Sequence, residues 1–196
     1  MLKFLLISVF ILTNLFLAAC SNITNKKKQI EAAHINTSLG LLYLEQGYPK
    51  IAQEKLLVAY KKAPYDPEVC NALGYFFSHM GESSVANRYY LFAIKFAKEK
   101  SWFWHSYGRF LFQQGYYKEA LNCFLLVAKD LDYLYVAEAY ADASRATFKL
   151  DRKDLAKKYH NMAIIRGFKP KIASERGSDP FTKVLTPSNT KSLQLF

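Results

Sequence analysis

The sequence predicts an all-α fold in which helical hairpins stack into a superhelical solenoid. The first observation behind this prediction is a period, because Gly40, Gly74 and Gly108 are spaced 34 residues apart. The second is that an alanine follows each glycine by 12 residues, at Ala52, Ala86 and Ala120. The third is that a large side chain follows each alanine by four residues, at Leu56, Tyr90 and Phe124. Three consecutive units in one register indicate a structural repeat.

Packing between helices explains the pattern. A glycine in the first helix of each hairpin has no Cβ, so the second helix approaches closely through its alanine, and the large side chain fills the space around the crossing. A glycine inside a helix costs roughly 1 kcal/mol relative to alanine, so three at one period indicate a shared packing role. One hairpin cannot bury its own apolar face, so neighbours must stack, and the stack has a concave groove. The pattern resembles the tetratricopeptide (TPR) repeat, which implies a TPR-type solenoid of helix-turn-helix repeats.

The repeats assign residues 31–166 to a TPR domain of about four units. The first three units are predicted at 33–66, 67–100 and 101–132, with internal turns at Gly47, Gly81 and Gly115. The fourth unit is displaced, because Ala156 and Ala163 place its start near Ala137, two residues later than the period requires. In this degenerate unit Ser144 replaces the repeat glycine and Asp151 stands at the turn.

The N-terminal segment 1–19 is predicted to be a signal peptide. Its apolar run over 4–17 is too short and too interrupted for a membrane span, and it fits the hydrophobic region of a secretory signal. It ends in Leu17-Ala18-Ala19-Cys20, which resembles the bacterial lipobox. The resemblance implies a lipoprotein signal peptide, cleaved before a Cys20 whose thiol carries a diacylglyceryl group. An ordinary signal peptide followed by a chance cysteine is the alternative.

A lipid on Cys20 would anchor the protein to a membrane, since several acyl chains give lasting attachment. Ser21 follows the cysteine where, in the sorting rule of Gram-negative bacteria, an aspartate would retain a lipoprotein in the inner membrane. The resemblance therefore implies an outer-membrane lipoprotein that faces the periplasm. Residues 20–30 are predicted to be the lipidated cysteine and a polar tether with a lysine cluster at 26–28, either solvated or in contact with anionic headgroups. Apart from this covalent lipid, no cofactor is predicted.

The net charge and the C-terminal segment do not identify a partner. A formal net charge of +11 is compatible with nucleic acid, anionic lipid or an acidic protein. An exported, lipid-anchored chain would rarely meet nucleic acid, so a nucleic-acid partner is not predicted. Residues 167–196 lack the helical period and contain Pro170, Pro180 and Pro187, so they are predicted to form a basic, mostly irregular tail.

The sequence offers little chemistry, so an enzyme with a small-molecule substrate is not predicted. It has no Gly-rich phosphate loop and no Gly-x-Ser-x-Gly elbow, and its four histidines show no metal-ligand spacing, so no metal site is predicted. Three cysteines are an odd number, which argues against a disulfide framework. Cys70 and Cys123 fall on helix faces and are predicted to be buried free thiols.

The first helices of the repeats are predicted to line a protein-binding groove. In TPR units the first helix directs positions 2, 5, 9, 12 and 13 into the concave groove. The residues singled out at such places are Tyr75, His79, Trp102, His105, Arg109, Phe112, Arg145, Phe148 and Lys149. Aromatic and arginine side chains are common at binding hot spots, so a basic, aromatic groove would suit an acidic helix or extended peptide. Alternatively, individual aromatics pack only between repeats.

A lipobox followed directly by TPR units resembles the type IV pilus biogenesis lipoproteins called pilotins (PilF or PilW). The resemblance is most specific in the stretch 104–111, Trp-His-Ser-Tyr-Gly-Arg-Phe-Leu, and in Gln-Gly-Tyr-Tyr-Lys-Glu-Ala at 114–120. It implies a protein without catalysis that binds the pilus secretin and assists its outer-membrane localisation and multimerisation. An alternative from another class is a TPR lipoprotein that scaffolds cell-envelope enzymes acting on peptidoglycan.

Overall fold

The computed structural model describes residues 25–169, and all regular secondary structure in this range is helical. A first helix covers 25–45. It is followed by α2 (Pro49–Lys62), α3 (Pro67–His79), α4 (Ser83–Phe96), α5 (Ser101–Gln113), α6 (Tyr117–Val127), α7 (Val136–Lys149) and α8 (Lys153–Ile165). The signal peptide, Cys20 and tail residues 170–196 lie outside the described range.

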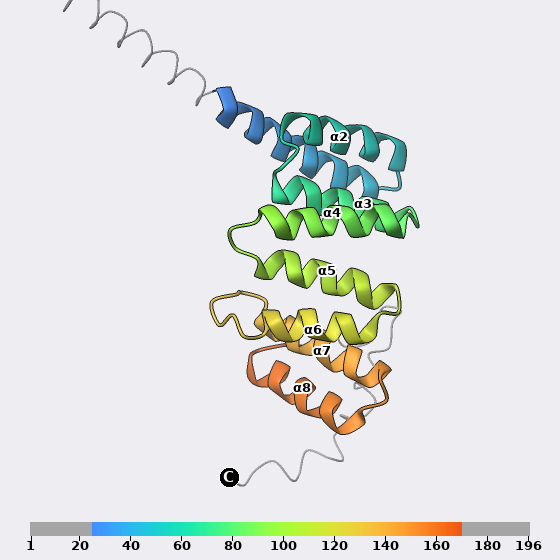
Figure 1. Cartoon of the computed structure of the whole chain (residues 1–196), viewed down its shortest axis with the longest axis vertical. Coiled ribbons are helices and arrows are strands. Elements are labelled where there is room, and N and C mark those ends of the chain that lie inside the picture. The colour runs from blue at the N-terminus through green and yellow to red at the C-terminus, as the bar shows by residue number, and fades with distance from the viewer. Residues whose placement is uncertain (1–24, 170–196) are drawn as a thin grey trace, which may run out of the picture.

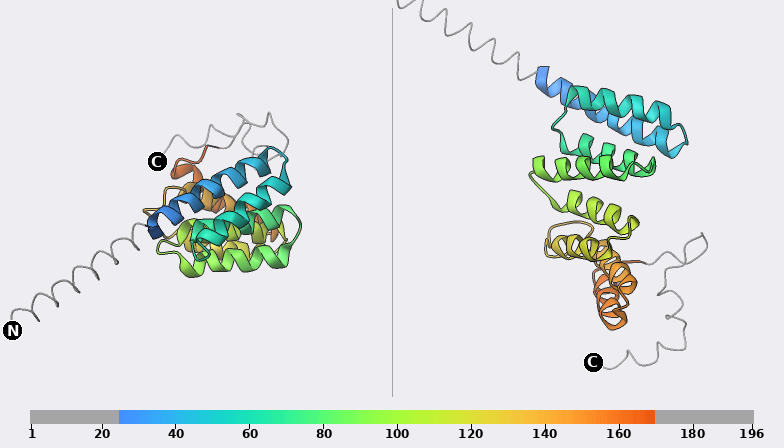
Figure 2. Two further views of the ribbon diagram at one scale, coloured as in Figure 1. Left: turned by 90° about the horizontal axis from the view of Figure 1, so that it is seen from above. Right: turned by 45° about the vertical axis from the view of Figure 1, so that its right-hand side comes forward.

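The helices stack in chain order along one axis. Figure 1 shows the first helix and α2 at one end of the stack and α7 and α8 at the other. The hairpin partners are α3 with α4, α5 with α6, and α7 with α8. In the right-hand view of Figure 2 the last helices are seen nearly end-on while the first run across the view, so the helix axes rotate along the stack. The architecture confirms the predicted all-α superhelical solenoid.

The repeat glycines lie where the two helices of a hairpin cross. A Cβ on Gly74 would lie 3.0 Å from the Tyr90 ring, and one on Gly108 would lie 2.8 Å from the Phe124 ring. In the fourth unit the hydroxyl of Ser144 donates a hydrogen bond of 2.8 Å to the carbonyl oxygen of Ala156. This carbonyl is equivalent to that of Ala52, which would lie 3.1 Å from a Cβ on Gly40. The serine therefore keeps the close approach and adds a hydrogen bond.

Each hairpin turn uses the same backbone motif. Just beyond the end of the first helix of each pair lies a residue with positive φ, and these residues are Gly47, Gly81, Gly115 and Asp151. The next amide donates to the carbonyl five residues earlier, as in Glu82 to Phe77 and Arg152 to Thr147. This Schellman motif satisfies carbonyls that the helix end would otherwise leave unpaired. Asp151 thus keeps, at φ 56°, the conformation for which the other three units use glycine.

Helix starts follow local capping chemistry in the first half of the molecule. Pro49 and Pro67 occupy first-turn positions, where a missing N–H has no cost. The carboxylate of Asp66 caps α3 by accepting from the amides of Glu68 and Val69, and it also contacts His34 Nε2 at 3.0 Å. Asp66 therefore joins the first unit to the second.

The first helix begins earlier than the sequence suggests. Residues 25–30, assigned to the polar tether from the sequence, are helical. Ile30 packs against the core of the first unit, and Gln29 accepts a hydrogen bond of 3.4 Å from Lys62 of α2. The helix and its contacts with the first unit therefore extend into the segment predicted to be a polar tether.

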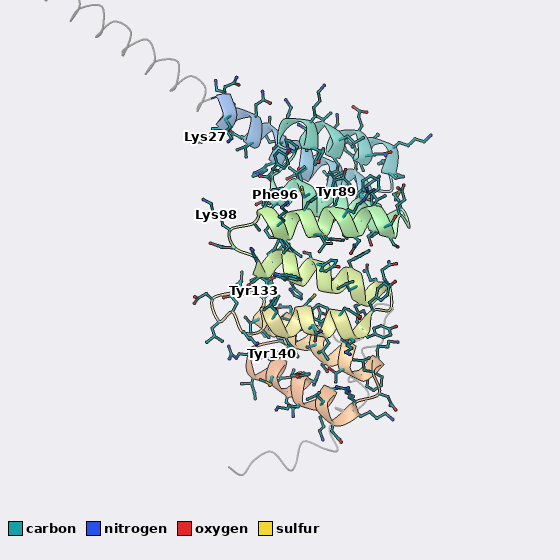
Figure 3. All side chains as sticks on the ribbon, viewed as in Figure 1. Lys27, Tyr89, Phe96, Lys98, Tyr133 and Tyr140 are labelled. Atoms are coloured by element: carbon teal, nitrogen blue, oxygen red, sulfur yellow. The ribbon has the colours of Figure 1, made fainter. Side chains whose placement is uncertain are left out.

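The last two units meet differently from the others. α7 begins at Val136, one residue before the predicted start of the fourth unit. The connection from α6 to α7 is longer than those between earlier units, and α6 packs on α7 more extensively than α2 on α3 or α4 on α5. Tyr133 lies in this connection, beside the stack in Figure 3. The break in the period is therefore also a change in packing.

Candidate functional site

A cleft of about 360 Å³ lies where the third and fourth units meet. α5 and α7 provide most of its walls, and Tyr135 and Phe168 close it from the flanking segments. The residues that line it are Trp102, His105, Ser106, Arg109, Tyr135, Glu138, Asp142, Arg145 and Phe168. Four residues predicted for the groove, Trp102, His105, Arg109 and Arg145, therefore come together here.

A buried polar network forms the inner wall of this cleft. Asp142 Oδ2 lies 2.8 Å from His105 Nε2, and Asp142 Oδ1 accepts from the guanidinium of Arg145. His105 Nδ1 lies 3.1 Å from the hydroxyl of Tyr133. A neutral imidazole with its proton on Nε2 satisfies both partners, since Nε2–H donates to Asp142 and Nδ1 accepts from Tyr133. The network links α5, α7 and the connection between α6 and α7.

The electrostatics of the network favour this neutral imidazole. Burial lowers the pKa of His105 to about 4, and the positive charges of Arg109 and Arg145 act in the same direction. Arg145 already neutralises Asp142, so a proton on His105 would gain little from that carboxylate. His105 and Asp142 are 6% and 5% exposed, so they support the cleft wall and offer little surface to a ligand.

The rim of the cleft is aromatic and accessible. Trp102 is 49% exposed and Tyr135 is 41% exposed, and their ring centroids are 5.7 Å apart. Arg109 is exposed on α5 beside them, while Arg145 is half-buried and held by Asp142. Glu138 and Asp142 add two carboxylates to the two arginines, so the formal charges in the cleft balance. The sequence instead predicts a basic groove. Arg109 remains the accessible cation at the rim.

The other predicted groove residues do not line this cleft. Tyr75 and His79 are exposed on α3 and contact one another, with ring centroids 4.9 Å apart. Phe112 is half-buried against Tyr117 of α6, at 5.2 Å between ring centroids, so it packs within its own unit. Phe148 is half-buried and Lys149 is exposed near the end of α7.

Sequence reasoning missed the residues that complete the cleft. Ser106 and Asp142 occupy equivalent positions in the third and fourth units, each directly after the position that His105 holds in the third. Their place beside a predicted groove position could have indicated them from the sequence. Glu138 stands at the position of Trp102 in the next unit. Tyr135 and Phe168 come from segments outside the repeat pattern, so the period gives no signal for them.

The cysteines and the metal-ligating side chains of the described residues add no further site. Cys70 and Cys123 are buried free thiols, as predicted, and burial raises their pKa values to about 12 and about 11. Between residues 25 and 169 no three His, Cys, Asp or Glu side chains gather as candidate metal ligands. In the same range no helix has the length and hydropathy needed to cross a bilayer.

Comparison with known proteins places the fold among TPR-type solenoids. No protein-family model matches the chain. An uncharacterised protein of Haemophilus influenzae is 23% identical over 149 residues, which cover 76% of this chain and 83% of the relative. A solved structure of PilF from Pseudomonas aeruginosa superposes with a TM-score of 0.67 at 24% identity, over 71% of this chain. This chain covers 63% of that PilF chain, less than two thirds of its length.

Two further solved structures support the same fold. MamA superposes with a TM-score of 0.59 at 20% identity, covering 74% of this chain and 85% of MamA. BtubC from P. vanneervenii superposes with a TM-score of 0.60 at 13% identity, covering 74% of this chain and 69% of BtubC. At these identities the similarity concerns the fold alone. Stacked repeats of this kind create an extended concave surface.

Proposed function

We propose that this protein is a lipid-anchored TPR adaptor of the pilotin kind, which binds the type IV pilus secretin in the periplasm and assists its assembly in the outer membrane. The observation that carries the proposal is the cleft between the third and fourth units. Its exposed Trp102 and Tyr135 and its accessible Arg109 stand on a rigid, hydrogen-bonded wall. Large aromatic and arginine side chains on a preorganised surface are typical of protein-binding hot spots.

Two further features support the same proposal. The lipobox ending at Cys20, with Ser21 after it, would place the mature chain on the outer membrane. The structural similarity to PilF, of which this chain covers 63%, agrees with a pilus role.

Secretin assembly in a deletion strain tests the proposal. Without the gene, the secretin should remain monomeric or in the inner membrane, as seen by fractionation and native gels. A Trp102→Ala/Arg109→Glu variant should fail to restore multimers and should bind the secretin at least about tenfold more weakly, since both changes fall on the rim. Normal multimers in the deletion strain would reject the proposal, and co-purification of peptidoglycan hydrolases would then favour the envelope-enzyme adaptor.

A matched control keeps the test specific to the cleft. Tyr116 is 57% exposed and Lys118 is exposed, and neither lines the cleft. The Tyr116→Ala/Lys118→Glu variant makes comparable changes, an aromatic to alanine and a cation to glutamate, away from the cleft and should restore multimers fully. Both variants should retain the helical circular dichroism of the unmodified protein, because all four side chains are accessible. If the two variants bind the secretin equally well, the binding surface lies elsewhere.

A further inference from the structure

The first helix of each unit stacks on the preceding unit through three fixed positions. In the second unit these positions hold Val69, Leu73 and Phe76, which are 0%, 0% and 2% exposed. In the fourth unit they hold three alanines, each fully buried, at Ala139, Ala143 and Ala146. An apolar side chain at such a position therefore belongs to an interface wherever a unit precedes it.

In the first unit the same three positions form an exposed apolar face. They hold Ile35, Leu39 and Leu42, which are 57%, 37% and 47% exposed. Within residues 25–169 no unit precedes this helix, so nothing covers the face. A terminal repeat of a soluble solenoid normally carries polar residues on its outer side. Three large aliphatic residues in stacking register thus indicate that this face, called here the end face, contacts something other than water.

Basic side chains continue the end face toward the start of the helix. Lys26, Lys27 and Lys28 are exposed, and Lys28 lies seven residues, or about two helical turns, before Ile35 on the same side. Figure 3 shows Lys27 at the outer tip of the first helix. An open depression of about 710 Å³ connects Lys27 with Ile35 and Leu39, and Glu31 is the one acidic residue that lines it. The surface is therefore apolar along the helix and basic at its first turn.

The predicted lipid anchor lies next to this basic turn. Cys20 precedes the described helix by five residues, a span of at most about 18 Å even when fully extended. If Cys20 is lipidated, as the proposed function assumes, the lysines are held within that distance of the membrane surface. Acyl chains on Cys20, basic side chains and an exposed aliphatic face then follow one another along the chain.

We propose that the end face docks on an anionic phospholipid surface. Ile35, Leu39 and Leu42 contact the boundary between headgroups and acyl chains, and Lys26, Lys27 and Lys28 contact phosphate groups. This is the arrangement of an interfacial amphipathic helix, whose binding combines apolar burial with attraction to anionic lipid. An apolar protein helix on the same face would leave the lysines unexplained, and self-association would bring together chains of net charge +11.

Binding of the mature chain without its lipid tests the proposal independently of the secretin. Residues 20–196 carrying Cys20→Ser contain every described helix, and they can be floated with vesicles of phosphatidylethanolamine and phosphatidylglycerol or of phosphatidylcholine alone. We expect binding to the anionic vesicles that weakens with salt. The triple variant Ile35→Gln/Leu39→Gln/Leu42→Gln should reduce partitioning at least about tenfold, and replacing the three lysines by glutamine should remove the salt dependence.

The control variant changes equally exposed leucines away from the end face. Leu91, Leu126 and Leu131 are 42%, 47% and 69% exposed, and their replacement by glutamine should leave vesicle binding unchanged. Equal vesicle binding by the end-face variant and the unmodified chain would overturn the proposal, as would no binding to anionic vesicles. A dimer in sedimentation that only the end-face variant abolishes would instead assign the face to a second copy. Either result would reject lipid docking by the end face, while secretin assembly would still test the proposed function separately.

Discussion

At the scale of single residues, Asp151 is the clearest departure from the repeat. It holds φ 56° in a turn where Gly47, Gly81 and Gly115 adopt 80°, 78° and 85°. A side chain in this left-handed region is strained, although aspartate tolerates it better than most residues. The carboxylate of Asp151 lies 3.7 Å from the ammonium of Lys153, and both side chains are exposed, so this ion pair contributes little.

We therefore expect Asp151→Gly to stabilise the protein. Glycine removes the backbone strain, and a gain of about 0.5–1 kcal/mol would raise the melting temperature by roughly 1–4 °C. The reverse change, Gly115→Asp, makes the same exchange in the third unit and should lower the melting temperature by a similar amount. Thermal unfolding followed by circular dichroism measures both, and a lower melting temperature for Asp151→Gly would contradict the strain argument.

The sequence allows some of these residue roles to be predicted and not others. The glycines at 40, 74 and 108 are predictable because in these three units a Cβ would come too close to a large side chain of the second helix. The substitution at Ser144 is visible in the sequence, but its hydrogen bond to Ala156 depends on a carbonyl position that no pattern encodes. Likewise, the period suggests that His105 faces the groove, while its burial depends on Tyr133 in an aperiodic segment.

At the scale of helices, the crossing of α5 and α6 determines how the third unit packs. A Cβ added to Gly108 would lie 2.8 Å from the Phe124 ring and 3.0 Å from the Cβ of Cys123. Phe124 is almost fully buried and cannot turn away without disturbing the core. α5 and α6 would therefore have to separate to accommodate even one methyl group.

We expect Gly108→Ala to destabilise the protein although alanine favours a helix. Overpacking typically costs 1–3 kcal/mol, which exceeds or offsets the gain of about 1 kcal/mol in helix propensity. Ser144→Ala is the matched control, since the fourth unit already has a Cβ at this position and loses only one hydrogen bond, about 1 kcal/mol. Chemical denaturation gives both free energies. A Gly108→Ala protein at least as stable as the unmodified chain would mean that the helices adjust freely.

Helix positions were easier to predict than the segments between helices. α3 and α5 begin at Pro67 and Ser101, where the sequence placed the second and third units, because capping and periodicity act locally. The connection from α6 to α7 has neither signal, so its contribution of Tyr133 and Tyr135 to the cleft was not predictable. The predicted part of the cleft is therefore Trp102, His105 and Arg109 of α5 with Arg145 of α7.

At the scale of the whole molecule, the bond between His105 and Asp142 joins the third unit to the fourth. Its contribution to stability depends on pH, because the pKa of His105 is about 4 in the folded chain and about 6.5 when exposed. Above pH 6.5 the imidazole is neutral in both states and the effect is absent. As the pH falls from 6.5 toward 4, the unfolded chain binds the extra proton and the folded unit loses stability.

We expect acid to loosen the fourth unit first. The loss approaches about 3 kcal/mol near pH 4, and hydrogen exchange should show α7 and α8 losing protection before α3 and α4. A His105→Gln variant removes the titrating group and should reduce this pH dependence. His34 has the opposite sign, since its bond to Asp66 raises its pKa and the resulting stability is lost as the pH rises. Uniform loss of protection along the stack would contradict the assignment to His105.

The longer connection between α6 and α7 has a consequence for stoichiometry. A strictly periodic solenoid offers an elongated partner several equivalent binding positions, and the partner can shift by one repeat with little change in binding free energy. Here the period changes at one junction only, and that junction carries the cleft with Trp102 and Tyr135. We therefore expect a ligand that recognises this cleft to have one binding position within the described units, and one molecule to bind per chain in one alignment. The irregular spacing of the repeats thus makes one position on the surface different from all the others, so that a partner can recognise it.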